Sequence, residues 1–370
     1  MSGPPSEGPG GLPVPAGGAV EDYLRAQATE FLRALRAQRE NGPASDEASE
    51  AARALRRAAR RIAGALHTFG PLLEPSWSDA VRPELAWLSS TLAREHAYTT
   101  RLTRLLGALH RLCGGPDPEA AGELPAPAPR SSRARTAVAT PSARRAPATA
   151  PSATGTLTVG AAKAGALLER QLTLARTRAH SAALGALGSS RFHAVADQIA
   201  VLASEVPLNP ATASAPSQES LASLATGTAT RLMDAVEALP LCRAGHPYNA
   251  EALILGGVTP DTAPDGQDAP WHQVGRLLRL HRYAQEVTGP VPGVPRGLAA
   301  TGLLGAGHAL DQHRDAADAA KAAAEAARTP RITPATAYAL GVLHADQRHE
   351  VEAARFAFQR IWQRGTVTAR

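Results

Sequence analysis

The sequence is poor in aromatic residues and in cysteine, and each shortage excludes a class of protein. Only 4% of the 370 residues are aromatic although 44% are hydrophobic, so alanine, leucine and valine must form the core. Such residues favour packed helices over a sheet-rich fold. Two cysteines, Cys113 and Cys242, are too few for a disulfide framework or a four-cysteine metal site.

Long apolar runs and targeting signals are also missing. No stretch approaches the ~18 consecutive apolar residues that a membrane span needs. Residues 1–18 contain neither the basic nor the apolar segment of a signal peptide, and their Gly/Pro content predicts a disordered tail. We therefore expect a cytoplasmic protein without a membrane partner.

Positive charge is carried almost entirely by arginine. The formal net charge is +6 and the isoelectric point about 9.9, yet Lys163 and Lys321 are the only lysines. A basic surface favours anionic partners, and the guanidinium fork binds phosphate oxygens in pairs. A GC-rich genome is an alternative cause of the same bias.

Apolar residues recur with helical spacing along most of the chain, and no segment alternates as a strand would. A Pro/Ala/Ser/Thr-rich segment with scattered arginines, residues 114–158, predicts a flexible linker. It divides an all-α protein into an N-terminal half, residues 19–113, and the remaining helices, residues 159–365. A loop is expected at residues 240–268. Helices are predicted at residues 20–39, 46–73, 78–112, 159–187, 190–204, 219–239, 270–288, 298–328, 334–345 and 347–364.

One predicted helix carries five arginines on one side. Arg53, Arg56, Arg57, Arg60 and Arg61 fall within an arc of about 140° when successive residues turn by about 100°. Like charges at these spacings repel each other. Such a stripe therefore either faces water or binds a strongly anionic ligand.

A second basic helix repeats this pattern downstream. His272 follows Arg53 by 219 residues, and Arg279 follows Arg60 by the same interval. Each basic helix precedes a long helix, which predicts two pseudo-symmetric antiparallel helical bundles. The polar residues of the second basic helix are His272, Arg276, Arg279, Arg282 and Tyr283.

At these residues the chain resembles the CHAD family, the conserved histidine α-helical domain. The family motif is approximately His-x-x-Arg-x-x-x-basic-basic-x-Arg. Arg53 stands at the histidine position of the first copy, and Ala63, Gly275 and Leu280 stand where cations are expected. Other segments that are similar to the family are residues 84–88, 186–192, 310–315 and 338–362.

The resemblance implies an all-helical protein that binds inorganic polyphosphate in a basic cavity between the two motif helices. It also implies association with polyphosphate granules. Arginine forks grip successive phosphates, and counterion release makes such binding salt-dependent. For His313 and Asp315 a structural pair between helices is the favoured interpretation. The predicted phosphate contacts are Arg53, Arg56, Arg60, Arg61, His272, Arg276, Arg279 and Arg282, with Arg57, Arg191, Tyr283, His313 and Asp315 in supporting positions.

Neither catalysis nor metal binding finds support in the sequence. It lacks a GxSxG elbow, a GxxxxGK[ST] loop and a GxGxxG after a strand, so we expect no enzyme and no cofactor. The pairs His308/His313 and His344/His349 are each five residues apart, on diverging faces of a helix, so we expect no metal site. Two alternatives stay open, a non-specific nucleic-acid-binding protein and a degenerate helical scaffold for protein partners.

Overall fold

The computed structural model is helical throughout the part of the chain that it describes. There it contains ten α-helices, one short 3-10 helix and no β-strand, which confirms the predicted all-α class. Most of the predicted linker, residues 115–152, and most of the predicted tail, residues 1–15, lie outside the described residues. The described residues are 16–40, 46–114, 153–210, 218–246, 264–289 and 300–367.

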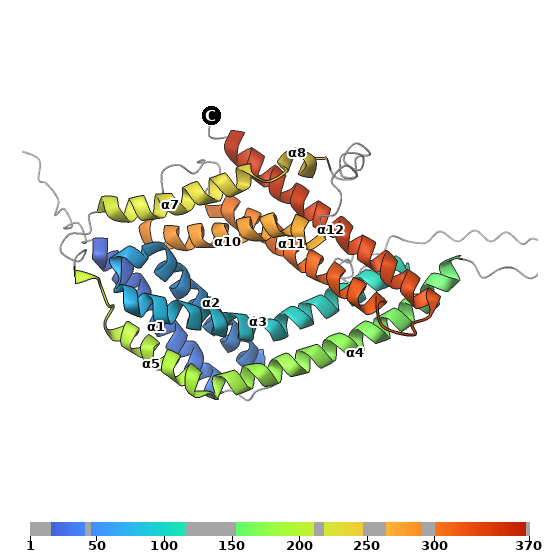
Figure 1. Cartoon of the computed structure of the whole chain (residues 1–370), viewed down its shortest axis with the longest axis horizontal. Helices are drawn as coiled ribbons and strands as arrows, with labels where there is room; N and C mark the ends of the chain where they lie inside the picture. The colour runs from blue at the N-terminus through green and yellow to red at the C-terminus, as the bar shows by residue number, and fades with distance from the viewer. Residues whose placement is uncertain are drawn as a thin grey trace, which may run out of the picture. The chain divides into compact units, whose positions relative to one another are not determined.

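The helices follow one another along the chain as Figure 1 shows. Their bounds are α1 Ala16–Glu40, α2 Asp46–Phe69, η1 Gly70–Leu72, α3 Pro75–Leu112, α4 Ala153–Leu187, α5 Ser190–Ser204, α7 Gln218–Glu237, α8 Leu241–Ala244, α10 Pro264–Thr288, α11 Ala300–Ala327 and α12 Pro334–Val367.

Most predicted helices are confirmed, but two predictions are wrong in detail. The predicted pair at 334–345 and 347–364 is one continuous helix, α12, because neither proline nor glycine interrupts the chain around Asp346. The loop expected at 240–268 contains α8 and the start of α10. Helix α10 begins at Pro264, since proline fits the first helical position, where no backbone N–H is needed.

The chain divides into two compact units, and each is assembled from segments that are far apart in the sequence. The first unit holds Met1–Ala97, Arg176–Arg314 and Val351–Arg370, and the second holds Tyr98–Ala175 and Asp315–Glu350. Helices α3, α4, α11 and α12 therefore contribute residues to both units. The division into an N-terminal and a C-terminal half with pseudo-symmetric bundles stays a prediction.

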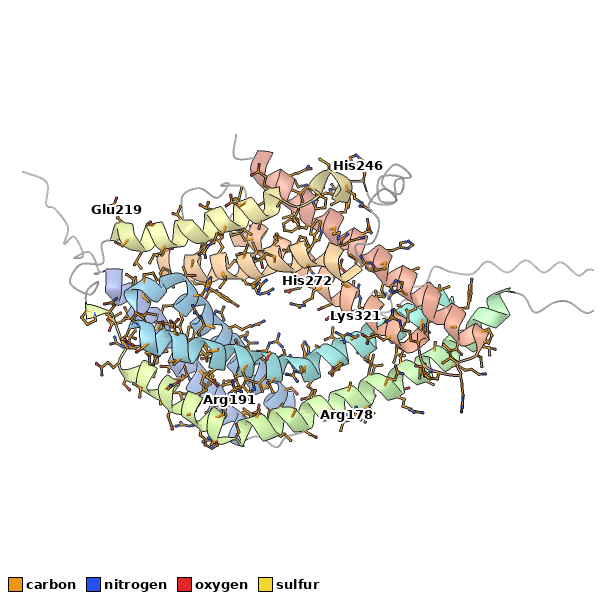
Figure 2. The ribbon with its side chains drawn as sticks, viewed as in Figure 1. Arg178, Arg191, Glu219, His246, His272 and Lys321 are labelled. Atoms are coloured by element: carbon orange, nitrogen blue, oxygen red, sulfur yellow. The ribbon has the colours of Figure 1, made fainter. Side chains whose placement is uncertain are left out.

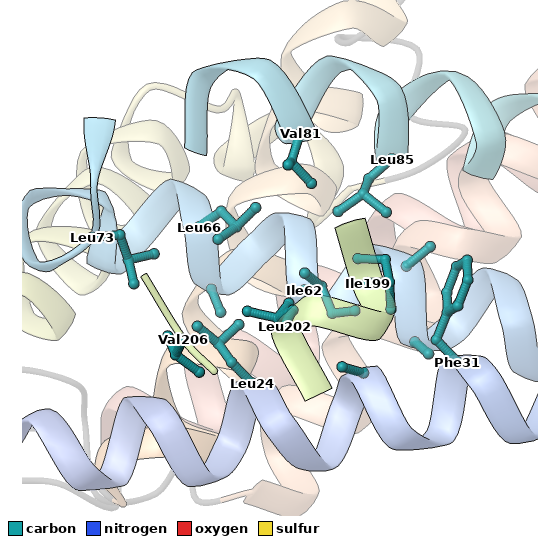
Figure 3. Close-up of a cluster of buried hydrophobic side chains, with 14 of the residues drawn as sticks. Leu24, Phe31, Ile62, Leu66, Leu73, Val81, Leu85, Ile199, Leu202 and Val206 are labelled. Carbon is teal, nitrogen blue, oxygen red and sulfur yellow. The ribbon is translucent and has the colours of Figure 1, made fainter. Parts of the chain in front are cut away.

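The first unit contains both basic helices, and its first core fixes α2 (Figure 3). Leu24 and Phe31 of α1 pack with Ile62 and Leu66 of α2, and all four are at most 1% exposed. Residues seven and four positions apart lie on one face of a helix. The arginines of α2 are consequently left on its other side. Helices α3 and α5 add Val81, Leu85, Ile199 and Leu202.

A second core in the same unit fixes α10 against α7, α11 and α12. It contains three aromatic residues that contact one another in sequence. The rings of Trp271 on α10 and Phe358 on α12 meet edge to face with centroids 5.8 Å apart, and Phe358 stacks on Trp362 at 5.5 Å. This packing positions the side chains near the start of α10.

The second unit has a core of small side chains. Ala319 and Ala323 of α11 and Ala339 of α12 are fully buried together with Leu105 and Leu168. Alanine at helix contacts lets backbones approach closely, which explains how a chain so poor in aromatic residues still forms a tightly packed helical core.

Candidate anion-binding site

Helix α2 presents its arginines to different surroundings. Arg53 and Arg57 are exposed, and both pair with Glu50 of the same helix, at 3.3 and 2.9 Å. The hydrogen bond from Arg57 lowers the pKa of Glu50. Arg56 and Arg60 are instead half-buried and lie near charged residues of α10 and α11. The predicted stripe is therefore divided between a solvated edge and a partly enclosed edge.

At the enclosed edge, Arg56 and Arg60 meet Arg279 of α10 and Arg314 of α11 around the carboxylate of Asp311. The Oδ1 atom of Asp311 lies 3.1 Å from Nη1 of Arg314 and 3.6 Å from Nη1 of Arg279. We call Arg56, Arg60, Arg279 and Arg314 the arginine cluster. In these contacts Asp311 pairs with two of the four arginines and interacts electrostatically with a third, Arg56.

Burial and mutual repulsion destabilise the charge of the arginine cluster. Burial, followed by the charges of Arg60 and Arg314, lowers the pKa of Arg56 to about 10. Burial also lowers the pKa of Arg279; Asp311 opposes this effect, whereas Arg314 and Arg60 add to it. The Nε atom of Arg60 is buried and has no hydrogen-bond partner. An anion bound here would relieve the repulsion and accept the unused hydrogen bond.

Arg61 is held by an ion pair that joins three helices. Its Nε and Nη2 atoms donate to Oε2 and Oε1 of Glu286 on α10, at 2.8 and 3.2 Å. The hydroxyl of Tyr23 on α1 donates to the same carboxylate at 2.8 Å. Burial, and then this bond to Glu286, raises the pKa of Tyr23. Arg61 thus already has a bidentate anionic partner from the protein itself.

Tyr283 of α10 packs against α2 at the contact between the two helices. The guanidinium of Arg61 lies 5.9 Å from the centroid of its ring. A Cβ atom at Gly64 would lie 2.6 Å from its Cδ2 atom, so only glycine leaves room for the ring on the backbone of α2. Tyr283 also interacts electrostatically with Arg56 and Arg279. The ring therefore forms one wall of the arginine cluster.

His272, which Figure 2 labels on α10, lies beside a group of buried charges. We call Asp268, His313 and Arg355 the buried network. Arg355 of α12 donates from Nη2 to Oδ1 of Asp268 at 2.6 Å and from Nε to Nε2 of His313 at 3.3 Å. Trp271 stacks on His313 with centroids 5.7 Å apart, and the exposed ring of His272 meets His313 edge to face at 5.4 Å.

The buried network has the properties of a structural contact between helices. Burial lowers the pKa of His313, and its Nε2 atom accepts a hydrogen bond from Arg355, so the imidazole fits its neutral form. Nε2 also lies 3.5 Å from Oδ1 of Asp268, which opposes the effect of burial on the pKa, and Nδ1 is buried without a hydrogen-bond partner. These contacts tie α11 to α10 and α12 through His313, Asp268 and Arg355, whereas the structural role expected for Asp315 stays a prediction.

Three further predicted residues lie outside the arginine cluster. Arg276 is exposed and hydrogen-bonds to Gln273 on its own helix. Arg282 is half-buried and lies over α11, since a Cβ atom at Gly307 would be 3.7 Å from its Nη1 atom. Asp315 is half-buried and is the first residue of the second segment, Asp315–Glu350, of the second unit.

Arg191 lies on α5, as Figure 2 shows, with partners of its own. Its guanidinium forms a bidentate ion pair with Glu84 of α3, at 2.6 and 3.0 Å, and lies 4.1 Å from the ring centroid of Trp87. The hydrogen bond to Glu84 raises the pKa of Arg191. The structure thus gives Arg191 an anionic partner and an aromatic platform that the sequence did not indicate.

Sequence reasoning missed Arg314 and Asp311, although it selected the residues on either side of Arg314. Both belong to the 310–315 segment that resembles the family. Leu310 is buried and its Cβ lies 3.6 Å from where a Cβ of Gly275 would be, so positions 311 and 314 flank the contact between α10 and α11. Their spacing of three residues, with opposite charges, was the available signal.

Among the residues that the structure describes, no group of three or more His, Cys, Asp or Glu side chains is arranged to hold a metal ion. Over the same residues, no helix combines the length and the apolar character that a membrane span needs.

Comparison with known proteins adds three findings. The family model described as CHAD domain matches residues 26–324. Among solved structures, PptA from Streptomyces chartreusis is 57% identical in sequence, and the match covers 95% of this chain and 100% of that chain with a TM-score of 0.71. The CHAD domain from the plant Ricinus communis is 18% identical over 96% of this chain and 93% of that chain, with a TM-score of 0.49. No curated protein matches.

Proposed function

Because the chain belongs to the CHAD domain family, which is associated with polyphosphate binding, we propose that it binds inorganic polyphosphate without catalysing a reaction. The proposed site is the arginine cluster, Arg56, Arg60, Arg279 and Arg314. The carrying observation is the crowding of positive charge there: Asp311 pairs with Arg279 and Arg314 in a partly enclosed place, and burial together with the charges of neighbouring arginines lowers the pKa of Arg56 and Arg279.

Polyphosphate suits this arrangement better than a single small anion does. It offers phosphates in succession, so several guanidinium forks can be satisfied at once. Arg282, over α11, and Arg276 and His272, farther along the exposed side of α10, extend the cationic surface and complete the proposed set of contacts. Arg61 is a weaker candidate, because Glu286 already binds its fork. In a cell, such binding would bring the protein to polyphosphate granules.

The proposal is tested with Arg56→Ala/Arg60→Ala in the full chain. Binding of long-chain polyphosphate is titrated across a salt series, with duplex DNA and heparin as competitors. We expect affinity to fall by about tenfold for each arginine removed, or ~1.4 kcal/mol each. The slope of log affinity against log salt should shrink by about 1.4, from ~0.7 per lost phosphate contact.

The matched control is Arg82→Ala/Arg231→Ala, which removes two exposed arginines of the same unit near His67 and lowers the net charge equally. Unchanged binding in Arg56→Ala/Arg60→Ala would contradict the assigned site. Wild-type protein that prefers duplex DNA of equal charge would support a nucleic-acid binder. Protein that binds neither polyanion at physiological salt would support a scaffold for protein partners.

A further inference from the structure

A groove lies between α1 and α2, at the solvated edge of the arginine stripe. It encloses about 550 Å³. Ala26 of α1 and Ala54 and Ala58 of α2 line it, and their small side chains leave space that larger ones would fill. The guanidinium-bearing residues at its wall are Arg33, Arg57 and Arg61.

The charges of this groove suit an anion. Glu30 is the one carboxylate among its described lining residues, against Arg33, Arg57 and Arg61, of which Arg61 is already bound by Glu286. Arg33 pairs with Glu30 at 2.9 Å, and Arg57 pairs with Glu50 at 2.9 Å. The side chain of Arg33 is 71% exposed and that of Arg57 is 48% exposed. Exposed ion pairs of this kind contribute little stability, so a multivalent anion can replace the two carboxylates.

The groove and the arginine cluster lie on opposite edges of one continuous arginine surface. At about 100° per residue, Arg56 and Arg60 point to one edge of α2, Arg57 and Arg61 to the other, and Arg53 lies between them. Arg53 is exposed. Because a helix with its side chains is only about 10–12 Å across, a linear polyanion needs few units to pass from one edge to the other.

We infer that this groove is a second binding segment for the polyphosphate chain, occupied by chains long enough to extend past Arg53 from the arginine cluster. The inference rests on the proposed function. It assigns an inorganic chain rather than a nucleotide, because no aromatic side chain is among the described residues that line the groove, so none can stack on a base. Because only chains long enough to extend past Arg53 reach the groove, long polyphosphate should bind more tightly than short polyphosphate.

The test is Arg33→Ala/Arg57→Ala in the full chain, with long-chain polyphosphate and tripolyphosphate as ligands. We expect the affinity for long chains to fall about tenfold and the log–log salt slope to shrink by about 1.4. Tripolyphosphate, which fits the arginine cluster alone, should bind as it does to wild-type protein. Arg33→Ala alone changes only α1 and should lower long-chain affinity in the same direction.

Two results would overturn the inference. One is an unchanged salt slope and an unchanged affinity for long chains. The other is an equal loss of affinity for long chains and for tripolyphosphate, which would mean that Arg57 belongs to the arginine cluster's site and not to a second one. Arg82→Ala/Arg231→Ala controls for net charge, and thermal unfolding verifies that each variant folds. The inference fails alone if Arg56→Ala/Arg60→Ala loses binding and Arg33→Ala/Arg57→Ala does not. The proposed function fails if wild-type protein does not bind long chains at all.

Discussion

The buried network and the arginine cluster lie in the same unit, and both set arginine beside carboxylate, but their charges are balanced differently. In the buried network, Arg355 and Asp268 are 11% and 5% exposed, and their closest atoms are 2.6 Å apart. In the arginine cluster, Asp311, which is 51% exposed, pairs with Arg279 and Arg314 and interacts electrostatically with Arg56, while Arg60 adds a further positive charge beside Arg56 and Arg279. Neutralised charge, packed on Trp271, joins α10, α11 and α12. Crowded positive charge opposes folding, and the proposed anionic ligand would offset it.

The largest expected effect comes from breaking the ion pair of the buried network. Asp268→Asn keeps the shape of the side chain and removes the charge that neutralises Arg355. We expect the free energy of unfolding to fall by up to about 3 kcal/mol, the lower end for breaking a buried ion pair, because Glu352, 3.7 Å from Nη1 of Arg355, still offsets part of its charge. Denaturant titration followed by circular dichroism measures this change.

The same titration on Arg56→Ala/Arg60→Ala provides the contrast. Removing these arginines relieves repulsion and deletes the buried Nε atom of Arg60, which has no hydrogen-bond partner. Stability should therefore stay within about 0.5 kcal/mol of wild type or rise. A loss as large as that of Asp268→Asn would mean that the cluster is structural and that the comparison is wrong.

A third buried basic group, His281 on α10, is neither paired like Arg355 nor crowded like the arginine cluster. Its surroundings favour the neutral form. Its ring is fully buried, Nδ1 lies 3.2 Å from the hydroxyl of Thr228, and burial lowers its pKa. Below the ordinary histidine pKa of about 6.5, the unfolded chain then binds a proton that the folded chain does not. The contribution of His281 to the free energy of unfolding is therefore fully present above about pH 6.5. It is lost as the pH falls from about 6.5 toward the lowered pKa of the folded protein.

His281→Leu should flatten this dependence. The wild-type free energy of unfolding should lose up to about 1.4 kcal/mol per pH unit through this histidine as the pH falls below about 6.5. The variant should lose less over the same range, because it has no proton to exclude. Equal slopes in denaturant titrations at pH values on both sides of this window would exclude His281 as the source.

Much of the fold was predictable from local pattern, because helix spacing and capping act over a few residues. The start and end of α5 were predicted to the residue, and Ser189 caps it by accepting from the backbone N–H of Phe192 at 3.2 Å. The break predicted at Asp346 was wrong, although the local sequence already favoured a continuous helix, since no proline or glycine stands there to end it.

The site was predictable in its residue types but not in its charge balance. The arc on α2 placed five arginines on one side, yet Glu286, 225 residues from Arg61, neutralises that arginine. Only the tertiary contact reveals this. The structure also gives a reason for two departures from the family motif. Gly275 is buried against Leu310, and Ala63 packs against the first core. An arginine at either position would be too large for the space and would displace these neighbours.

The smallest expected effect comes from removing the carboxylate of Asp311, which Arg279 and Arg314 share. Asp311→Asn leaves the helix intact and stops the competition between Asp311 and phosphate for Arg279 and Arg314. We expect the affinity for polyphosphate to rise up to about fivefold, because an exposed ion pair is worth ~1 kcal/mol at most. Titration with long-chain polyphosphate at fixed salt measures the change.

Asp318→Asn is the matched control, because it makes the same change in net charge at a half-exposed aspartate, paired with Arg101 at 2.7 Å, that belongs to the second unit. An affinity increase confined to Asp311→Asn would mean that the excess charge of the cluster sets the binding strength and that Asp311 limits it. Weaker binding in Asp311→Asn would reverse that role. Asp311 would then act by orienting Arg279 and Arg314 toward the ligand, and the arginine cluster would resemble the buried network in depending on its carboxylate.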